Sequence, residues 1–453
     1  MAISRLQEPG YASAEWGLSA AETYIRLHLL FFLTNLLGLN PGLAGLLISL
    51  GVLWDGVTDP LVGWLSDRTR SRWGRRFPFL LLGLFAFPTL LFVLFWSGWQ
   101  ELSVHARVWG FALAYLAFNT ATTCLAVPHA ALAGDLSQDD PTRTRLFAWR
   151  YFFTTMGLLS GIAVPGYLLS SQGNVLSTYE TSGLLLAGIG VISAGLTILS
   201  SYREDWQNTR LQKVEQAALG SFLKTMLRNR PFLILITAFV FATVGQAINS
   251  SLALYYYRLY LKLPEADIQK ILGVFTVVIV GSILGWNLLS RRYSKTLLLA
   301  LGVGALGIAG SLSYPFFAPG DLRGPYVMAV FGGILVGSVF LLEVMVADTV
   351  DYGAIQSGKA DYGSYFGIWK LGSKFSRAVA IGLSGLLLEA IGFEAHAEPQ
   401  ESTLKAIAWL FGPGVGLFFI GGAVLVLFYP LHAQRVAQIQ RILRKRRPFA
   451  SAS

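Results

Sequence analysis

The sequence predicts an all-α membrane protein with about twelve transmembrane helices. Three observations lead to this fold class: 54% of the 453 residues are hydrophobic, only 13% are charged, and the charged residues gather between long apolar segments. A soluble globular domain carries roughly 25% charged residues, about twice this share. The single cysteine, Cys124, excludes an intramolecular disulfide framework, and no cysteine or histidine cluster suggests a metal site.

The predicted spans are apolar stretches of about 20 residues, the length that crosses the hydrocarbon core of a bilayer. We place them at 18–38, 42–66, 77–98, 106–134, 147–171, 181–200, 230–258, 266–290, 296–315, 325–349, 363–392 and 404–430. Arginine and lysine concentrate in the loops after the second, fourth and eighth spans and in the C-terminal tail. The positive-inside rule therefore predicts a bacterial-type inner (plasma) membrane protein with both termini in the cytoplasm.

The chain divides into two halves of six spans. We predict an N-terminal half at 1–200, a cytoplasmic linker at 201–229, a C-terminal half at 230–433 and a basic cytoplasmic tail at 434–453. A weak internal repeat relates the halves, since the run from Phe31 to Pro41 resembles the run from Tyr255 to Pro264. Two parallel six-helix repeats are the layout of the major facilitator fold, which holds its substrate at the midplane between the repeats.

Two acidic residues inside the second span, Asp55 and Asp59, are the strongest functional candidates. An ionisable side chain in a span costs at least ~2.5–3.5 kcal/mol, so it is a functional candidate by default. Their separation of four residues puts both carboxylates on one helix face. Such a pair cannot stay doubly ionised unaided, so either one carboxyl is protonated or a cation lies between them. We predict a monovalent cation site for Na⁺, Li⁺ or H⁺, with Thr58 adding a hydroxyl oxygen; salt bridges to loop arginines are the structural alternative.

Polar side chains of the first and fifth spans form part of the predicted substrate-binding set. Glu22 and Arg26 are four residues apart, either as a neutralised pair facing a cavity or as a structural bridge near the membrane surface, and Tyr24 lies between them. Arg150 opens the fifth span. It either binds an anionic or hydroxylated solute or marks the helix entrance.

Three further residues complete that set. Glu343 lies in the tenth span, where the cost of burying its charge implies a cationic partner, and we expect Lys374 of the eleventh span in that role. His129 follows a proline in the fourth span. It either lines the cavity or packs as a hydrogen-bonded core histidine.

An arginine-rich loop follows the second span. It carries Arg68, Arg70, Arg75 and Arg76 after Gly63 and Asp67, and it resembles the cytoplasmic loop with which major facilitators latch helix ends in one conformation. The alternative is that these arginines only reflect positive-inside topology, and both explanations can hold at once. The sequence contains no nucleophile–base constellation, phosphate-binding loop or zinc-protease motif. It therefore predicts no enzyme, no ATP-driven pump, no cofactor other than a coupling cation, Na⁺ or H⁺, and no nucleic-acid partner.

The run from Trp54 to Phe79, WDGVTDPLVGWLSDRTRSRWGRRFPF, resembles the signature of the glycoside–pentoside–hexuronide:cation symporter family, whose best-known member is the melibiose permease. The resemblance continues through 127–132, 143–150, 347–352 and 363–367. It implies a major facilitator fold and coupling to Na⁺, Li⁺ or H⁺. The family's cation-binding carboxylates fall on Asp55 and Asp59, and its nearby polar residues on Thr58, Arg150 and Lys374.

The same resemblance bears on the solute. Ser19 and Ala126 stand where the melibiose permease has the aspartates that hold sugar hydroxyls, although Glu22 offers a carboxylate one turn from Ser19. Lysophosphatidylcholine symporters of vertebrates resemble the same family and carry amphiphiles. The sequence thus predicts a monomeric, cation-coupled symporter of a small solute that works by alternating access. A sugar or glycoside is the first expectation, a lysolipid or other amphiphile the alternative, and a non-transporting membrane assembly or sensor protein the remote one.

Overall fold

The structure is a computed structural model of the whole chain. It describes residues 7–136, 140–171, 174–208, 229–357, 362–394 and 398–431, together with three short pieces of the C-terminal segment, 435–436, 438–439 and 441–442. The described residues form helices and connecting turns, with no β-strand among them. All twelve predicted spans coincide with helical segments. The all-helical fold class is therefore confirmed.

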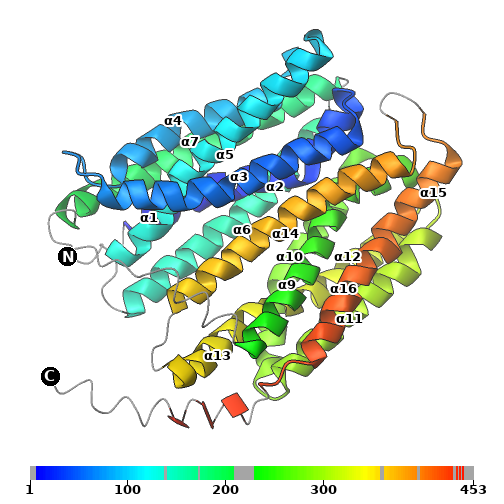
Figure 1. Cartoon of the computed structure of the whole chain (residues 1–453). Helices are drawn as coiled ribbons and strands as arrows, with labels where there is room; N and C mark the ends of the chain where they lie inside the picture. The colour runs from blue at the N-terminus through cyan, green and yellow to red at the C-terminus, as the bar shows by residue number, and fades with distance from the viewer. Residues whose placement is uncertain are drawn as a thin grey trace, which may run out of the picture. The chain divides into compact units, whose positions relative to one another are not determined.

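The chain forms two compact units, and most of the first comes from the N-terminal half. This unit comprises residues 1–215, 263–273 and 381–399. Its N-terminal helices are α1 (Glu8–Ala12), α2 (Ala14–Phe31), α3 (Pro41–Arg68), α4 (Phe77–Leu94), α5 (Val104–Leu136), α6 (Asp140–Ser171) and α7 (Val175–Asn208). Helix α2 packs against α6 and α7, while α4 packs against α5 and α7, and α3 packs against α5 (Figure 1).

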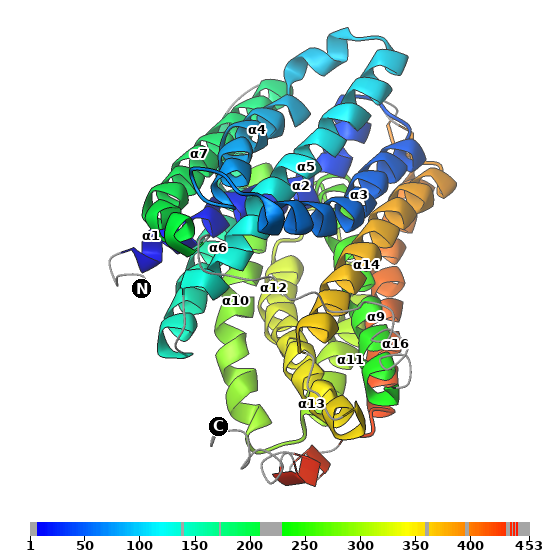
Figure 2. The ribbon, with the colours of Figure 1, turned by 60° about the vertical axis from the view of Figure 1, so that its left-hand side comes forward.

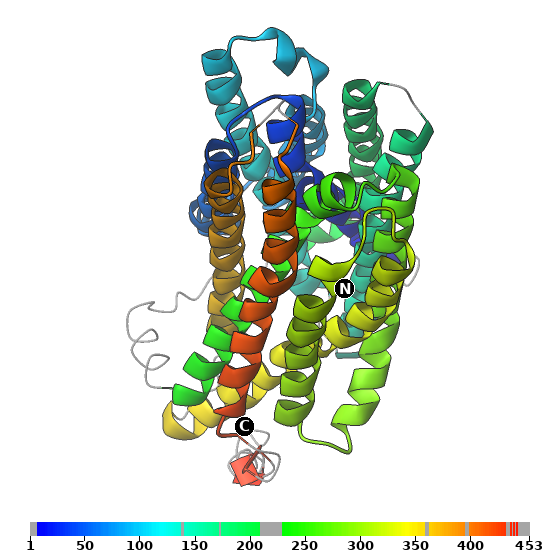
Figure 3. The ribbon, with the colours of Figure 1, turned by 90° about the vertical axis from the view of Figure 1, so that its right-hand side faces the viewer.

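The second unit comprises residues 216–262, 274–380 and 400–453. Two helices, α10 (Glu265–Ser290) and α14 (Tyr362–Ala390), contribute to both units. The other helices are α9 (Arg230–Leu254), α11 (Lys295–Ser313), α12 (Arg323–Val336), α13 (Phe340–Ser357), α15 (Glu401–Trp409) and α16 (Val415–Leu427). Helix α16 packs against α9 and α11 (Figure 3). A short 3-10 turn at Gly337–Val339 joins α12 to α13, so that the two make one span (Figure 2).

The weak sequence repeat has a structural counterpart at the ends of α2 and α9. Helix α2 continues into a π-helical turn at Phe32–Leu36, and α9 continues into one at Tyr255–Tyr260. Each turn is followed by a residue in the left-handed conformation, Gly38 (φ 68°) and Lys262 (φ 53°) respectively. Lysine rarely adopts this conformation, so its presence shows that the turn geometry is kept in the second copy without a glycine.

Within the residues that the structure describes, eleven helical segments are long and apolar enough to cross a membrane by length and composition. Helix α2, the first predicted span, is not one of them because Glu15, Glu22 and Arg26 make it more polar than the others. The twelve-span prediction agrees with these eleven segments plus α2. Of these three charged side chains, Glu15 takes part in a polar cluster with residues of α5 and α6.

Candidate functional site

The two predicted cation-binding carboxylates lie on α3, and that of Asp59 contacts α5. Asp55 and Asp59 are half-buried, and Thr58 between them is only 3% exposed. The Thr123 hydroxyl of α5 donates a hydrogen bond to Asp59 Oδ1 at 2.9 Å, and its oxygen lies 3.3 Å from Thr58 Oγ1. Thr123 was not predicted. The structure therefore gathers carboxylate and hydroxyl oxygens from two helices at one place.

The chemistry of these donors fits a hard cation. Carboxylate, hydroxyl and carbonyl oxygens are the ligands that such cations prefer. Pro60 has no N–H, so the Gly56 carbonyl loses its usual partner within the helix at the level of Asp55 and Asp59. Within the described residues no group of three histidine, cysteine or acidic side chains lies together. The donor set therefore fits a monovalent cation or a proton better than a transition metal.

Helix α3 is held against α5 on the side of the carboxylate pair. The Trp54 indole N–H donates to Thr120 Oγ1 at 2.9 Å, one turn from Thr123. A Cβ atom at Gly51 would lie 2.2 Å from the Tyr115 ring, a distance that real side chains do not adopt. Gly51 is therefore required for the close approach that brings Thr123 to Asp59.

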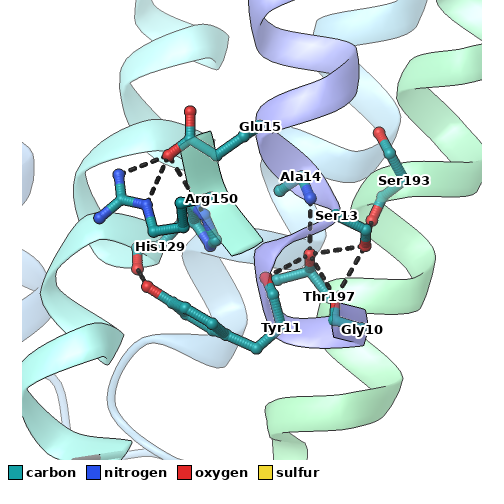
Figure 4. A network of polar contacts seen from close by, with 9 residues as sticks. All are labelled: Gly10, Tyr11, Ser13, Ala14, Glu15, His129, Arg150, Ser193 and Thr197. Carbon is teal, nitrogen blue, oxygen red and sulfur yellow. Dashed lines mark hydrogen bonds and ion pairs between the residues drawn. The ribbon is translucent and has the colours of Figure 1, made fainter. Parts of the chain in front are cut away.

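A second polar cluster joins α2, α5 and α6 (Figure 4). Arg150 of α6 donates from both Nε (2.8 Å) and Nη2 to a single oxygen, Oε1, of Glu15 on α2. His129 Nε2 of α5 lies 3.5 Å from the same oxygen. His129 is fully buried, whereas the side chains of Glu15 and Arg150 are 17% and 19% exposed. Three helices therefore converge on one carboxylate oxygen.

Close packing between α2 and α6 explains why Glu15 and Arg150 meet. A Cβ at Gly157 would lie 2.4 Å from the Trp16 carbonyl oxygen, and one at Gly161 would lie 2.6 Å from that of Ala20. Two glycines one turn apart on α6 thus let the helix backbones touch.

The short helix α1 closes the cluster beneath His129 (Figure 4). The Tyr11 ring centroid lies 4.9 Å from that of His129, and its hydroxyl donates to the His129 carbonyl at 3.2 Å. Burial raises the pKa of Tyr11 to about 12, so this hydroxyl keeps its proton at neutral pH. Two hydroxyl groups fix α1 to α7: Ser13 donates to the Ser193 carbonyl at 2.8 Å, and Thr197 donates to the Tyr11 carbonyl at 2.9 Å.

The remaining predicted residues of the first span lie in different surroundings. Glu22 is exposed and Arg26 is half-buried. Tyr24 is completely buried, donates to the Tyr179 carbonyl at 2.8 Å and packs 4.2 Å from the Phe95 ring centroid. This environment contradicts the prediction that Tyr24 binds substrate, because its hydroxyl is used within an aromatic core. Glu15, which precedes the predicted start of the span, is the residue that contacts Arg150.

Glu343 and Lys374 belong to the second unit. Glu343 lies in the first turn of α13, where a negative charge is favoured by the helix dipole, and it is exposed. The positive charge that acts on its carboxylate is that of Lys370, one turn before Lys374 on α14. The expected pairing of Glu343 with Lys374 stays a prediction. Lys374 is half-buried on the same helix.

The predicted latch lies between the end of α3 and the start of α4. Asp67 forms an ion pair with the buried Arg76 at 3.6 Å, and the Arg68 guanidinium stacks over the Trp64 ring at 4.3 Å. Arg75, which we had predicted in the latch, is also buried. At Gly63 an added Cβ would make only an ordinary contact, 3.6 Å from Val127, so packing does not require this glycine. Arg76, one of the arginines of the predicted loop, is thus the one that pairs with Asp67.

Comparison with known proteins identifies the class and then the family. The fold matches the crystal structure of a D-xylose–proton symporter with a TM-score of 0.69 at 12% sequence identity, covering 94% of this chain and 98% of that one. The fold is therefore that of a major facilitator transporter. The family described as MFS/sugar transport protein matches residues 10–433, and the chain belongs to it. This membership confirms the resemblance to glycoside–pentoside–hexuronide:cation symporters.

Two curated relatives match nearly the whole chain. A putative glycoside/cation symporter, YagG, of Escherichia coli is 26% identical over 92% of this chain and 90% of its own length. The sodium-dependent lysophosphatidylcholine symporter 1 of Gallus gallus is 24% identical over 93% of this chain and 86% of its own. The chain is thus a multi-pass membrane protein from a family of transporters, and its relatives include carriers of two different kinds of solute.

Proposed function

We propose that this protein is a cation-coupled symporter that moves a sugar or glycoside across a bacterial-type inner membrane by alternating access. The observation that carries the proposal is the oxygen cluster of Asp55, Asp59, Thr58 and Thr123, which joins α3 to α5 inside the membrane span. Membership of the sugar-transport family and the similarity to a glycoside/cation symporter support the same function.

The chemistry of coupling follows from the charge of this cluster. Two carboxylates in a poorly solvated span repel each other and hold the cluster in a costly state. A bound Na⁺, Li⁺ or proton compensates that charge, and the Thr123 hydroxyl can offer its lone pairs to the cation while its hydrogen remains on Asp59. The cation-bound cluster favours a different conformation of the protein from the empty, charged cluster. The two conformations therefore differ in their affinity for the cation, and this difference couples the cation to the solute.

The proposal includes the topology and the latch. Both termini lie in the cytoplasm, the chain works as a monomer, and Asp67, Arg68, Arg75 and Arg76 act at the cytoplasmic ends of α3 and α4. The arginine-rich composition of this loop supports that orientation. The ion pair between Asp67 and Arg76, which fixes α3 relative to α4, supports a role as a latch.

An amphiphile is the second candidate solute, and two observations favour it. The Ser19 hydroxyl donates to the Thr154 carbonyl at 2.8 Å, so this position offers a sugar neither a carboxylate nor the hydrogen of its hydroxyl group. Helix α3 also exposes large apolar side chains close to the carboxylate pair, with Val57 58% and Leu61 50% exposed. The similarity to a lysophosphatidylcholine symporter agrees with such a cargo.

The test is a flux screen in proteoliposomes with imposed Na⁺ or pH gradients and labelled glycosides and lysophosphatidylcholine. We expect gradient-driven uptake of a glycoside by the wild type, and loss of that uptake in Asp55→Asn and in Asp59→Asn. Glu101→Gln, which changes an exposed carboxylate outside the spans, is the control and should transport normally. Full gradient-driven uptake by both aspartate variants would refute the coupling site. Uptake of lysophosphatidylcholine alone would select the amphiphile, and no flux of any solute would favour the non-transporting alternative.

A further inference from the structure

We propose that the end of α3 and the loop after it bind an anionic phospholipid, whose phosphate is held by exposed arginines and whose acyl chain lies along an apolar stripe of α3. The site is separate from the cation cluster and from the polar cluster of α2, α5 and α6. It concerns a resident lipid, so it does not depend on which solute the protein moves.

The loop between α3 and α4 divides its arginines into a buried group and an exposed group. Arg75 and Arg76 are buried, and Arg76 forms the ion pair with Asp67. The exposed group has three members: Arg68, Arg70 and Arg72. Within the part of the chain that the structure describes, no carboxylate forms an ion pair with any of these three. Their positive charges are therefore available to an anion outside the protein.

Two of the exposed arginines are held on tryptophan rings. The Arg68 guanidinium lies 4.3 Å from the Trp64 ring centroid, and the Arg72 guanidinium lies 4.7 Å from that of Trp73. Trp64 is 50% exposed and Trp73 is 40% exposed. Tryptophan is enriched where a span meets the membrane surface, so the two rings mark the level of the lipid headgroups. A stacked guanidinium uses its face, and its N–H edge remains available to the two oxygens of a phosphate.

The loop is ordered by a tight turn around Ser71. The Ser71 hydroxyl donates to the Gly74 carbonyl at 2.7 Å and accepts from the Trp73 backbone N–H at 3.0 Å. Gly74 has a φ of 110°, a conformation that favours glycine. The turn fixes the backbone of Arg70 and Arg72 on either side of Ser71, so these charges lose less freedom when a headgroup binds.

A stripe of exposed apolar side chains leads along α3 to the first of these tryptophans. Its members follow one another at intervals of three or four residues and are 42–59% exposed: Leu50, Leu53, Val57, Leu61 and Trp64. This spacing puts them on one helix face. The stripe is about 21 Å long at a rise of 1.5 Å per residue, and half of the hydrocarbon core of a bilayer is about 15 Å thick. It is therefore long enough for an acyl chain of the adjacent leaflet, and Arg68 lies one turn beyond its end.

The stripe lies on the opposite side of α3 from the cation site. Asp55 and Asp59 are each two residues from Val57, which places them about 160° round the helix from it. Asp59 contacts Thr123 of α5, whereas Val57 is 58% exposed. A lipid on the stripe would therefore leave the cation site unobstructed while it restrains the end of the helix that carries this site.

The combination of charge and apolar length defines the ligand. A phosphodiester headgroup with net negative charge complements unpaired arginines, whereas a zwitterionic headgroup brings a cation of its own to the same surface. Each arginine close to an anionic membrane surface contributes about fivefold in affinity. A soluble phosphate would meet the same arginines and leave the stripe uncovered, so the two features together favour an anionic phospholipid.

The test is native mass spectrometry of the full-length protein in detergent, titrated with phosphatidylglycerol or with phosphatidylcholine of identical acyl chains. We expect the first phosphatidylglycerol to bind about twentyfold or more tightly than phosphatidylcholine. The double variant Arg68→Gln, Arg72→Gln should lower this preference about twentyfold, since it removes two of the three charges. The control is Arg291→Gln, Arg292→Gln, which removes two exposed arginines from the loop after α10 and should lower the preference by no more than about twofold.

Replacement of a tryptophan tests the stacked arrangement. Trp64→Leu keeps the stripe apolar but removes the ring beneath Arg68, and it should lower the preference about two- to fivefold. Trp109→Leu replaces a tryptophan that is 70% exposed on α5 and should leave the preference unchanged. The substituted side chains are exposed, so we expect every variant to fold, and thermal unfolding checks this.

Glycerol 3-phosphate, added at the same concentration as the lipid, distinguishes a lipid site from a site for free phosphate. It should displace no lipid, because it cannot cover the stripe. Equal binding of the two lipids by the wild type, equal losses in the two double variants, equal losses in the two tryptophan variants, or displacement of the lipid by glycerol 3-phosphate would each overturn the inference. Asp55→Asn should keep the preference for phosphatidylglycerol, so a failure of the proposed coupling site leaves this inference standing.

Discussion

Replacement of Thr123 by valine tests the cation site most directly, because valine keeps the shape of threonine and removes only the hydroxyl. In the structure this hydroxyl donates to Asp59 at 2.9 Å and lies 3.3 Å from the Thr58 hydroxyl. We expect Thr123→Val to fold normally and to bind Na⁺ about tenfold more weakly than the wild type. Isothermal titration of Na⁺ into purified protein measures this change.

The magnitude follows from the kind of contact that is lost. In the cation-bound state the hydroxyl oxygen contacts the cation itself. A contact between a polar group and a charged one contributes about 1.5–3 kcal/mol, and the partial exposure of the site places this one near the lower end, which corresponds to about tenfold in affinity. The sign of the change is informative as well. If Thr123 only stabilised the charged carboxylate and never bound the cation, its removal would make cation binding more favourable, because the uncompensated Asp59 would be less stable.

A neighbouring threonine provides a matched control. Thr122 lies on the same helix, but its hydroxyl donates to the Phe118 carbonyl of its own helix at 2.9 Å. Thr122→Val should therefore leave Na⁺ affinity unchanged, and Thr123→Ser should restore most of the affinity lost in Thr123→Val. Unchanged or tighter Na⁺ binding by Thr123→Val, or equal losses in the two valine variants, would refute a ligand role for Thr123.

Two further predictions concern packing and the latch. Gly51→Ala should destabilise the protein by about 1–3 kcal/mol, because its methyl group would overlap the Tyr115 ring. Thermal unfolding measures this loss, with Gly188→Ala as the control, because a methyl group at Gly188 would have no atom within 4 Å. Equal melting temperatures of the two variants would show that α3 and α5 can separate. Asp67→Asn should slow transport while leaving Na⁺ affinity unchanged, because it weakens the pair with Arg76 without touching the cation site. A parallel loss of Na⁺ affinity would contradict a role confined to conformational change.

The carboxylate pair was predictable from sequence, whereas its hydroxyl partner was not. Asp55 and Asp59 stand out because a charge in an apolar span is costly wherever the helix packs. A threonine is not costly, since its hydroxyl can donate to the carbonyl four residues earlier, as those of Thr120 and Thr122 do. Only the packing of α5 on α3 distinguishes Thr123 from these two neighbours. The run of threonines in an apolar helix was the one available signal.

Glu15 was missed for a different reason, the uncertain boundary of the first span. Hydropathy placed the span from residue 18, but α2 begins at Ala14, so Glu15 lies in its first turn. Boundaries drawn from hydropathy exclude charged residues at a helix end by construction, although the helix includes them. Glu22 was chosen instead because it lies within the apolar stretch, and the structure shows it exposed. A charge inside the first span therefore indicated correctly that α2 carries a polar cluster, but it indicated Glu22 and not Glu15 as the carboxylate of that cluster.

Helix α5 is the element that connects the oxygen cluster beside α3 to the polar cluster beside α2 and α6. It carries Thr123 beside the carboxylates of α3 and His129 beside Glu15 and Arg150, about 9 Å apart along a helix that rises 1.5 Å per residue. Pro128 lies between them and removes one backbone hydrogen bond, which makes this stretch a natural place for α5 to bend. A movement of α5 that follows cation binding therefore reaches both the oxygen cluster and the contacts of His129 with Glu15 and Tyr11. Coupling of this kind is reciprocal, so the factor by which Na⁺ raises glycoside affinity must equal the factor by which the glycoside raises Na⁺ affinity. Since Thr123 belongs to one site only, Thr123→Val should reduce both factors together and leave glycoside binding in the absence of Na⁺ unchanged.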